Sequence, residues 1–452
     1  MEPLDATAEA LRRGDEAIVR MQDERLRHMI GLCARGHAYY RRVWADAEID
    51  VSEVRGVADL HKLPLTPKSA LMAEPENFRL RLNDLPLHER ALWDVIYTTG
   101  STGEPTPVYN TTHDYHAYLF QSRRVAEISG VRMDDVIANL FPLTPAPMGA
   151  FVRATANAFA AGATVFAVLP GARHGAFDIQ RSLDEAVRMI TAHGASVLWG
   201  VPSYVRRVLV RAGELGVTLP GLRMCAVAGE ASTPAMREEL RSRMRAVEAA
   251  DAIVFDRYGS TELGAFAQCA EDGDWHNPSP ELQYHEVVDP ETGAPLPDGA
   301  RGHLAVTHLD RRGTVLIRFL VGDVVGLERT PCPCCGRFGD RVVGPVARGN
   351  DLVKVKGMLV NPSVMIDHLG RMDGVEDFQI VVQRTRADDP FSGDRMLVRI
   401  ATQTSERNAL EATVADGISD AVRVRPDVEF VERDEIFDPE AQVKAKRFVD
   451  QR

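Results

Sequence analysis

The sequence predicts an α/β protein made of a large N-terminal domain with parallel sheets and a small α+β C-terminal domain. Between about residues 113 and 345, short apolar runs alternate with helix-like stretches, the pattern of parallel strands joined by helices. The 452 residues also exceed what one hydrophobic core organises. After about residue 348 the pattern changes to short β runs. We therefore expect domains at residues 1–347 and 348–452.

The N-terminal domain is predicted to contain a helix, a β-like region and a parallel sheet. Residues 6 to about 45 carry apolar side chains at roughly helical spacing, which predicts a packing helix. The pattern becomes more β-like around residues 280–345, with runs at Gly302–His308 and Thr314–Arg318. Between these regions, strands of a parallel sheet are predicted at Val136–Phe141, Thr164–Leu169, Ser196–Val201, Met224–Ala228 and Ala252–Phe255.

The C-terminal domain is predicted from three segments. Short β runs lie at Phe378–Val382 and Met396–Ile400, and a helix-like stretch follows at residues 405–422. This mixture predicts a small α+β unit.

Charge and hydropathy exclude several classes of protein. The net charge of −12 argues against binding to nucleic acid or to an anionic membrane surface, because both need a basic face. The first residues lack a basic and apolar leader pattern, and no window approaches about 18 uninterrupted apolar residues. We expect a cytoplasmic protein with no nucleic-acid and no membrane partner.

A loop rich in glycine and hydroxyl side chains follows the apolar run at residues 91–96. Gly100 and Gly103, within residues 97–109, allow the backbone to turn its N–H groups inward. Further donors come from the hydroxyls of Thr98, Thr99, Ser101 and Thr102. Such a loop can hold phosphate oxygens, although it lacks the Lys-Ser/Thr ending of a Walker A loop. A plain Thr/Ser/Gly-rich turn between strands is the alternative.

A second polar turn, at residues 256–264, follows a predicted strand. Ligands of open α/β sheets gather at the carboxyl ends of strands, where this turn lies. It offers an aromatic ring to stack on a base, hydroxyls to bind a phosphate and a carboxylate to hold Mg²⁺. These groups belong to Tyr258, Gly259, Ser260, Thr261 and Glu262.

The loop at residues 97–109 and the turn at residues 256–264 together resemble the ANL superfamily of acyl-adenylate-forming enzymes. The Thr-Gly-Ser-Thr-Gly-Glu-Pro-Thr form of the loop is most similar to the phenylacetate-CoA ligase branch. The resemblance covers nearly the whole chain, with the matching blocks in the same order. It implies that the C-terminal domain is mobile and rotates between two half-reactions.

The resemblance implies roles in nucleotide binding for several residues. Gly229 and Glu230 match the segment beside the adenine, and Tyr258 matches the residue that stacks on it. Thr261 matches the contact to the α-phosphate, and Glu262 matches the Mg²⁺ ligand.

Three further blocks match the family. Asp323 is similar to the residue that holds the ribose hydroxyls, Arg348 opens the hinge block, and Lys444 lies where the adenylation lysine is expected. Asn350 stands where the family usually has Asp, so either the domain rotation is expected to pivot differently or the thioesterification conformation is expected to be weakened. Lys446 remains an alternative to Lys444.

The implied reaction is the ATP-dependent activation of an aromatic carboxylic acid to an acyl-adenylate, followed by transfer to coenzyme A. Its cofactors are ATP, Mg²⁺ and coenzyme A, and its partner is a small aryl acid. An adenylation enzyme that loads an acyl carrier protein, or releases the adenylate to another acceptor, is a first alternative. A zinc-stabilised nucleotide-binding protein without catalysis is a second alternative, and a homodimer stays open.

The substrate pocket is predicted by position only. Its candidates follow predicted strands and are Phe141, Pro147, Met148, Tyr204 and Ala228. Small residues near the strand ends, including Gly149 and Gly200, leave room for a ring. No stretch indicates the tunnel that a long fatty acid needs.

A cysteine cluster predicts a metal site. Cys332 and Cys335 form a C-x-x-C pair followed by glycine, a spacing that lets two thiolates bind one zinc ion. The resemblance points to Cys269 and His276 as the other two ligands of a structural zinc. Cys334 remains the alternative to Cys335, and free thiols in a loop are the alternative to a metal.

Overall fold

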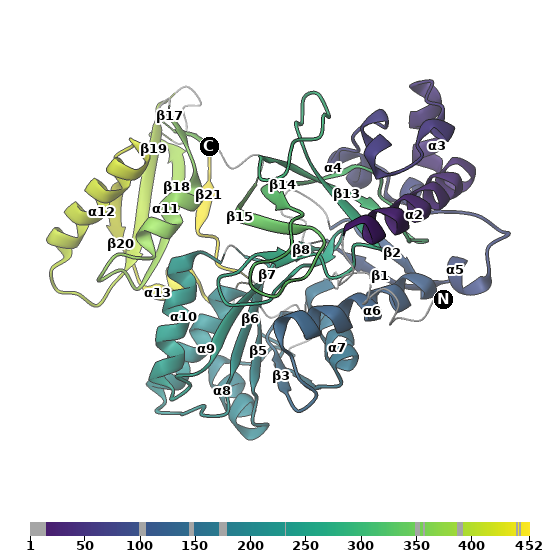
Figure 1. The fold of residues 1–452 in the computed structure, drawn as a ribbon. Helices are drawn as coiled ribbons and strands as arrows, with labels where there is room; N and C mark the ends of the chain where they lie inside the picture. The colour runs from purple at the N-terminus through teal and green to yellow at the C-terminus, as the bar shows by residue number, and fades with distance from the viewer. Residues whose placement is uncertain are drawn as a thin grey trace. The chain divides into compact units, whose positions relative to one another are not determined.

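The protein is described by a computed structural model that covers residues 15–98, 105–143, 149–170, 179–230, 232–348, 353–355, 358–386, 392–439, 442 and 444–452. The chain forms two compact units (Figure 1). The first unit contains Met1–Asp135, Thr144–Val165 and Phe255–Arg348. The second unit contains Val136–Leu143, Phe166–Val254 and Gly349–Arg452.

The N-terminal region of the first unit is helical, but the single helix predicted at residues 6–45 is wrong. The structure has two helices, α2 (Asp15–Gly36) and α3 (Ala38–Asp46), and residues 6–14 lie outside the described residues. His37 separates the helices because its backbone is extended and its Nδ1 accepts a hydrogen bond from the Tyr40 N–H at 3.2 Å. The spacing of apolar residues does not reveal an imidazole that caps the start of a helix, so the sequence did not predict this break.

Short elements lead from these helices to a hairpin. They are η1 (Val51–Glu53), η2 (Val57–Lys62), α4 (Lys68–Ala73), η3 (Pro75–Phe78) and α5 (Leu87–Arg90). The antiparallel hairpin consists of β1 (Leu92–Tyr97) and β2 (Pro107–Thr111). Helix α6 (Thr112–Ser129) starts directly after β2 with a capping box of Thr111 and Asp114, and it contacts α7 (Gly149–Ala161).

An antiparallel sheet forms the other half of the first unit. Its strand order is β10-β11-β15-β14-β13-β12. The bounds are β10 (Ala267–Gln268), β11 (Trp275–His276), β12 (Gln283–Val288), β13 (Arg301–His308), β14 (Phe319–Glu328) and β15 (Arg341–Arg348). The short pair β8 (Gly259–Ser260) and β9 (Gly264–Ala265) precedes it. The strand predicted at Gly302–His308 is therefore confirmed.

The strand predicted at Thr314–Arg318 is wrong. Its three central residues are at most 1% exposed, so the run has the composition of a buried strand. Its backbone is instead held by separate partners, because the Ile317 N–H donates to the Tyr40 hydroxyl at 2.6 Å and the Leu316 N–H donates to His308 Nδ1 at 3.1 Å. Arg318 then has a φ of 48°, which ends any extended run before β14 begins.

The second unit is built on parallel strands. The sheet order is β4-β3-β5-β6-β7, and the pairs β3–β5 and β5–β6 are parallel. The strands are β3 (Val136–Asn139), β4 (Thr164–Ala167), β5 (Val197–Gly200), β6 (Met224–Ala228) and β7 (Ile253–Arg257). The intervening helices are α8 (Leu183–Ala192), α9 (Pro202–Glu214) and α10 (Pro234–Ala246). All five predicted strands are confirmed with small shifts of their bounds.

The C-terminal part of the second unit has its own sheet, with order β20-β19-β18-β21, and its own apolar core. The strands of this sheet are β18 (Asp377–Arg384), β19 (Asp394–Ala401), β20 (Asp427–Phe430) and β21 (Phe448–Asp450). A separate pair is formed by β16 (Val353–Val355) and β17 (Met358–Val360). The helices of the C-terminal part are α11 (Pro362–Leu369), α12 (Arg407–Val422) and α13 (Arg433–Ile436). The predicted β runs and the predicted helix are confirmed. Among the helices in the described ranges, none is long and apolar enough to cross a membrane.

Candidate functional site

The glycine-rich loop is carried by the β1–β2 hairpin. Thr98 N–H donates to the Thr106 carbonyl at 3.0 Å, and the Thr106 N–H donates to Thr98 Oγ1 at 3.1 Å, so the two ends of the loop are held together. The predicted phosphate-binding members Thr99, Gly100, Ser101, Thr102 and Gly103 lie outside the described residues.

Two of the predicted nucleotide-binding residues are brought together in the first unit. The Tyr258 hydroxyl donates to Asp323 Oδ2 at 2.7 Å, although the two residues are 65 positions apart in the chain. The Tyr258 ring lies against Phe266, with ring centroids 5.6 Å apart. Gly259 follows at a point where an added Cβ would lie 2.1 Å from the Gly264 carbonyl, so the turn requires glycine. On the neighbouring strand, Arg348 is in register with Asp323.

Glu262 is buried and forms one ion pair. Its side chain is 2% exposed, and Oε1 has no hydrogen-bond partner within the described part of the chain. The Lys68 ammonium lies 3.3 Å from Oε1, an ion-pair distance without hydrogen-bond geometry. A buried carboxylate oxygen of this kind is suited to a divalent cation. Nothing in the sequence pattern singles out Lys68 except its place as the first residue of α4 after a proline.

Thr261 and Ser260 lie in the same turn as Glu262. The Ser260 hydroxyl accepts a hydrogen bond from the Leu263 N–H at 3.2 Å, which shapes the turn. A Cβ added at Gly149 would lie 3.6 Å from Thr261 Oγ1 and 3.5 Å from Ile96. These are ordinary van der Waals distances, so Gly149 lies close to the threonine hydroxyl.

The second unit brings together Gly229, Glu230 and Lys444. The Lys444 ammonium donates to the Gly229 carbonyl at 2.7 Å, and Gly229 has a φ of 83° that favours glycine. Lys446 is bound differently, through its backbone carbonyl, which accepts from Gln379 Nε2 at 3.0 Å. The structure therefore places Lys444 at the turn after β6.

Glu230 is surrounded by donors of the protein itself. Its carboxylate accepts from the Ser203 N–H at 3.0 Å, from the Ser203 hydroxyl at 2.7 Å and from the Ala445 N–H at 3.1 Å. Removal from bulk water raises the pKa of Glu230, and the bonds from Ser203 and the charge of Lys444 oppose that rise.

The predicted substrate residues lie after neighbouring parallel strands of the second unit. Phe141 follows β3, Tyr204 lies in the first turn of α9 after β5, and Ala228 ends β6. Phe141 and Tyr204 are buried. Pro147 and Met148 lie outside the described residues. Gly200 is small for a packing reason, because an added Cβ would lie 2.8 Å from Leu140 Cβ.

The cysteine cluster converges in the first unit. Ligand atoms of Cys269, His276, Cys332 and Cys335 all lie within 4.8 Å of one another. The Cys269 thiol is 3.3 Å from His276 Nε2 and 3.8 Å from the Cys332 thiol, and the Cys335 thiol is 3.6 Å from His276 Nε2. Cys334 is exposed and is not a member of this group, so the geometry favours Cys335.

The local fold explains this convergence. Cys269 directly follows β10 and His276 lies in β11, which pairs with β10, so the hairpin carries one half of the cluster. A tight turn carries the other half, because the Gly336 N–H donates to the Cys332 carbonyl at 2.8 Å and Gly336 has a φ of 69°. Burial and the charges of Arg337 and Arg341 lower the pKa of His276 to about 4, which leaves the imidazole neutral. Three cysteine sulfurs and a neutral imidazole form a set of ligands that fits zinc.

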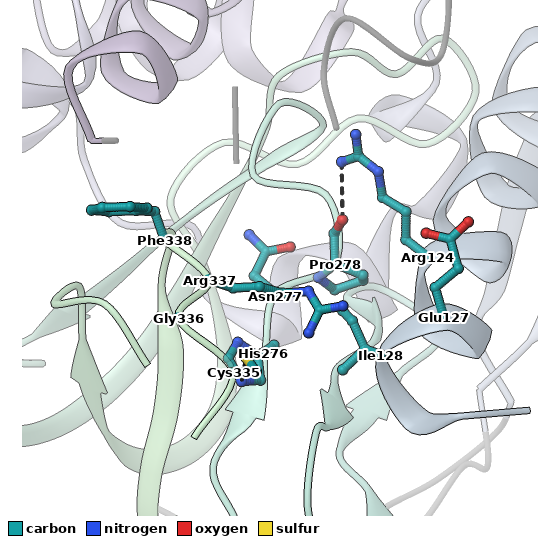
Figure 2. A pocket seen from close by; sticks show the side chains of 10 residues that line it. All are labelled: Arg124, Glu127, Ile128, His276, Asn277, Pro278, Cys335, Gly336, Arg337 and Phe338. Atoms are coloured by element: carbon teal, nitrogen blue, oxygen red, sulfur yellow. Dashed lines mark hydrogen bonds between the residues drawn. The ribbon is translucent and has the colours of Figure 1, made fainter. Parts of the chain in front are cut away.

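A pocket of about 360 Å³ adjoins this cluster, and Figure 2 shows His276 and Cys335 beside each other in its wall. Arg124 and Glu127 of α6 line another side. The Arg124 guanidinium donates to the Pro278 carbonyl at 3.1 Å and to Glu281 at 2.7 Å.

A second group with metal-binding residue types contains His88, Glu89 and His113. Glu89 pairs with Arg312 at 2.5 Å, and His113 pairs with Asp310 at 3.0 Å. Because Glu89 pairs with an arginine and His113 already contacts another carboxylate, we interpret this group as part of a polar network.

The comparison with protein families decides the class of the protein. A model described as AMP-binding enzyme matches residues 17–308, and a model described as AMP-binding enzyme C-terminal domain matches residues 357–452. The chain belongs to the AMP-binding enzyme family. The predicted membership of the acyl-adenylate-forming superfamily is thereby confirmed.

Individual relatives of this AMP-binding enzyme lie in one branch. A phenylacetate-coenzyme A ligase of Thermus thermophilus is 26% identical over 429 residues, covering 90% of this chain and 91% of the relative. One from Escherichia coli is 25% identical over 381 residues, covering 82% and 80%. These relatives support the predicted phenylacetate-CoA ligase branch.

Solved structures support the fold. A 2-hydroxyisobutyryl-CoA ligase, crystallised in the postadenylation state with an acyl-adenylate, has a TM-score of 0.80 at 22% identity and covers 97% of this chain and 90% of its own. The predicted fold class, with a large N-terminal adenylate-forming domain and a small C-terminal domain, is confirmed.

Proposed function

We propose that this AMP-binding enzyme activates an aromatic carboxylic acid with ATP and transfers the acyl group to coenzyme A. Membership of the family supports the adenylation step, and the names of the phenylacetate-coenzyme A ligases support the acid and the thiol. The observation that carries the assignment to this chain is the contact of Lys444 with the turn at Gly229, because it brings a cation from the C-terminal part to a predicted nucleotide-binding segment.

The first half-reaction forms the acyl-adenylate. A carboxylate oxygen of the acid attacks the α-phosphorus of ATP, the bond from that phosphorus to the bridging oxygen breaks, and pyrophosphate leaves with the electron pair. Negative charge develops around the α-phosphate, so donors and cations held beside it lower the barrier. We assign this role to Lys444, to Thr261, to Arg348 and to the hydroxyls of the loop at residues 97–109.

Glu262 is the proposed ligand of Mg²⁺, which neutralises phosphate charge when bound. Support comes from its buried Oε1, which has no hydrogen-bond partner within the described ranges. Tyr258 and Asp323 are the proposed partners of the adenosine, with the ring stacking on the base and the carboxylate accepting from the ribose. Their mutual hydrogen bond fixes the two side chains in one orientation.

The second half-reaction forms the thioester. The thiol of coenzyme A loses its proton to solvent, its sulfur attacks the acyl carbonyl, and AMP leaves. We keep residues 348–452 as the proposed mobile domain and residues 1–347 as the proposed adenylation domain. The carrier-protein acceptor and the homodimer remain predictions from the sequence.

The cysteine cluster is the proposed site of one structural zinc. Four protein ligands, Cys269, His276, Cys332 and Cys335, would complete a tetrahedral site and leave no position for substrate. Such an ion would link the β10–β11 hairpin to the turn after β14.

The aromatic substrate is tested by ATP–pyrophosphate exchange with benzoate, phenylacetate, anthranilate, acetate and palmitate, followed by addition of coenzyme A. We expect the aryl acids to give the highest kcat/KM, because the relatives are phenylacetate-coenzyme A ligases and a flat ring needs an apolar slot with few polar groups. A highest kcat/KM for palmitate or acetate would reject the aryl assignment. Exchange that coenzyme A does not convert to thioester would reject the acceptor.

A further inference from the structure

We propose that Glu230 is a positioning residue that holds the segment carrying Lys444, and that it does not bind the adenine itself. This inference rests on the proposed function, because it concerns how Lys444 reaches the α-phosphate. It also revises the role that the family resemblance implies for Glu230.

The Glu230 carboxylate already has protein partners on both oxygens. Oε2 accepts from the Ser203 N–H, and Oε1 accepts from both the Ser203 hydroxyl and the Ala445 N–H. Both oxygens are therefore engaged with the protein. These three protein donors take three of the about four acceptor positions of a carboxylate, so at most one position, on Oε2, is left for an amino group of adenine.

Two adjacent residues of the tail contact two adjacent residues of the turn after β6. Ala445 directly follows Lys444, and Glu230 directly follows Gly229. The Lys444 ammonium donates to the Gly229 carbonyl at 2.7 Å while the Ala445 N–H donates to Glu230 at 3.1 Å. A lysine has a long flexible stem, so a single contact at its tip does not fix its direction. The second contact, on the backbone, fixes the base of the stem.

The rest of the tail is anchored without Glu230. Arg447 pairs with Asp377 and donates to the Phe378 carbonyl at 2.8 Å. Strand β21 then pairs with β18 in the sheet of the C-terminal part. Loss of Glu230 is therefore expected to release residues 444 and 445 while the sheet remains folded.

The decisive experiment compares Glu230→Gln and Glu230→Ala with the wild type in both half-reactions. We expect kcat for ATP–pyrophosphate exchange to fall about tenfold for the glutamine and about a hundredfold for the alanine, with KM for ATP unchanged. Thioester formation from a preformed acyl-adenylate should keep its rate. Ser203→Ala should act in the same direction with a smaller loss, since it removes the hydroxyl donor but keeps the backbone donor.

Glu238→Gln is the matched control. Glu238 lies on α10 in the same unit and pairs with Arg241 and Arg245 of its own helix. This variant should leave both half-reactions unchanged. A raised KM for ATP with unchanged kcat would assign Glu230 to adenine binding and overturn the proposal. Equal losses in both half-reactions would indicate a general structural role and would also overturn it.

A second measurement does not depend on activity. Amide hydrogen exchange in peptides that cover residues 442–447 should become faster in Glu230→Ala and stay unchanged in Glu238→Gln. Unchanged exchange in Glu230→Ala would reject the positioning role. If the wild type shows no ATP–pyrophosphate exchange with any of the acids, the proposed function is rejected. The amide hydrogen exchange of residues 442–447 would still test the contact between Glu230 and Ala445.

Discussion

The turns at residues 228–230 and 260–262 each present a glutamate near a predicted nucleotide-binding segment, and the two glutamates differ in their surroundings. Glu230 accepts hydrogen bonds from three donors of its own unit. Glu262 is buried, and its Oε1 lies near the Lys68 ammonium but has no hydrogen-bond partner among the described residues. The difference teaches that residue type and motif position do not define a role. A carboxylate whose oxygens are occupied positions the protein, and one left open is available to a cation.

The largest expected effect tests the purpose of the Glu230 contact. Lys444→Ala should lower the rate of adenylation about a thousandfold, because it removes a cation at the developing charge of the α-phosphate. Transfer from a preformed acyl-adenylate should remain nearly intact. Pyrophosphate exchange and single-turnover thioester formation measure the two steps. Lys446→Ala is the control, and the assignment fails if its loss equals that of Lys444→Ala.

The comparison of side-chain surroundings extends to the cysteine cluster, in which the donor atoms of four side chains lie close together. Cys332→Ser should abolish binding of one zinc per chain and lower the free energy of unfolding by about 4 kcal/mol, because a structural ligand is lost. Cys334→Ser should keep the zinc and the stability, since Cys334 is exposed and outside the cluster. Elemental analysis and thermal unfolding measure both. Full zinc content in the Cys332 variant would contradict the proposed site.

Glu262 should respond to substitution differently from Glu230. Glu262→Gln should lower kcat for pyrophosphate exchange about a hundredfold and raise the Mg²⁺ concentration needed for half-maximal rate, because a neutral amide holds the cation less well. In Glu230→Gln the Mg²⁺ dependence should not move. A titration of MgCl₂ at saturating ATP separates the two glutamates. Identical Mg²⁺ curves for wild type and Glu262→Gln would remove Glu262 as a ligand.

The smallest expected effect concerns the carboxylate of Asp310, which, like that of Glu230, has protein partners. Burial tends to raise the pKa of Asp310, but His113, Arg312 and Arg25 outweigh it and lower that pKa to about 2. The folded pKa lies below the unfolded value, so the stabilisation is present at neutral pH and is lost as pH falls from about 4 through about 2. It amounts to about 2 kcal/mol.

Asp310→Asn should therefore reduce the free energy of unfolding at pH 7 by about that amount and flatten the loss between pH 4 and 2. Denaturant unfolding at several pH values measures it. An unchanged acid limb in the variant would show that other groups control acid unfolding.

Several features of the protein follow from short stretches of sequence. The apolar runs of the parallel sheet are recognisable because they lie between helix patterns and because β3, β5, β6 and β7 are mostly buried, whereas β4 is partly exposed. The residues of the proposed zinc site are recognisable because Cys332 and Cys335 are near neighbours in the chain, as are Cys269 and His276. A single turn or hairpin brings together residues that are close in the chain, so their proximity can be predicted from the sequence.

Other features required the folded chain. The break at His37 and the irregular run at Thr314–Arg318 depend on hydrogen bonds to Tyr40, a residue far from the second segment in sequence. A continuous apolar run has the same composition whether its amides bond to a strand or to scattered side chains. Hydropathy therefore predicted burial there correctly and the backbone conformation wrongly.

The sequence by itself determined the α/β class, the family and the residue types available for nucleotide and metal chemistry, because these reside in periodicity and short motifs. Tertiary structure alone decided which atoms each of those residues meets. It brought Lys444 to Gly229 and Ala445 to Glu230, and it placed Lys68 beside Glu262. Contacts across so many residues form only when distant segments pack, so the occupancy of a carboxylate, and with it the role of that carboxylate, is a property of the fold.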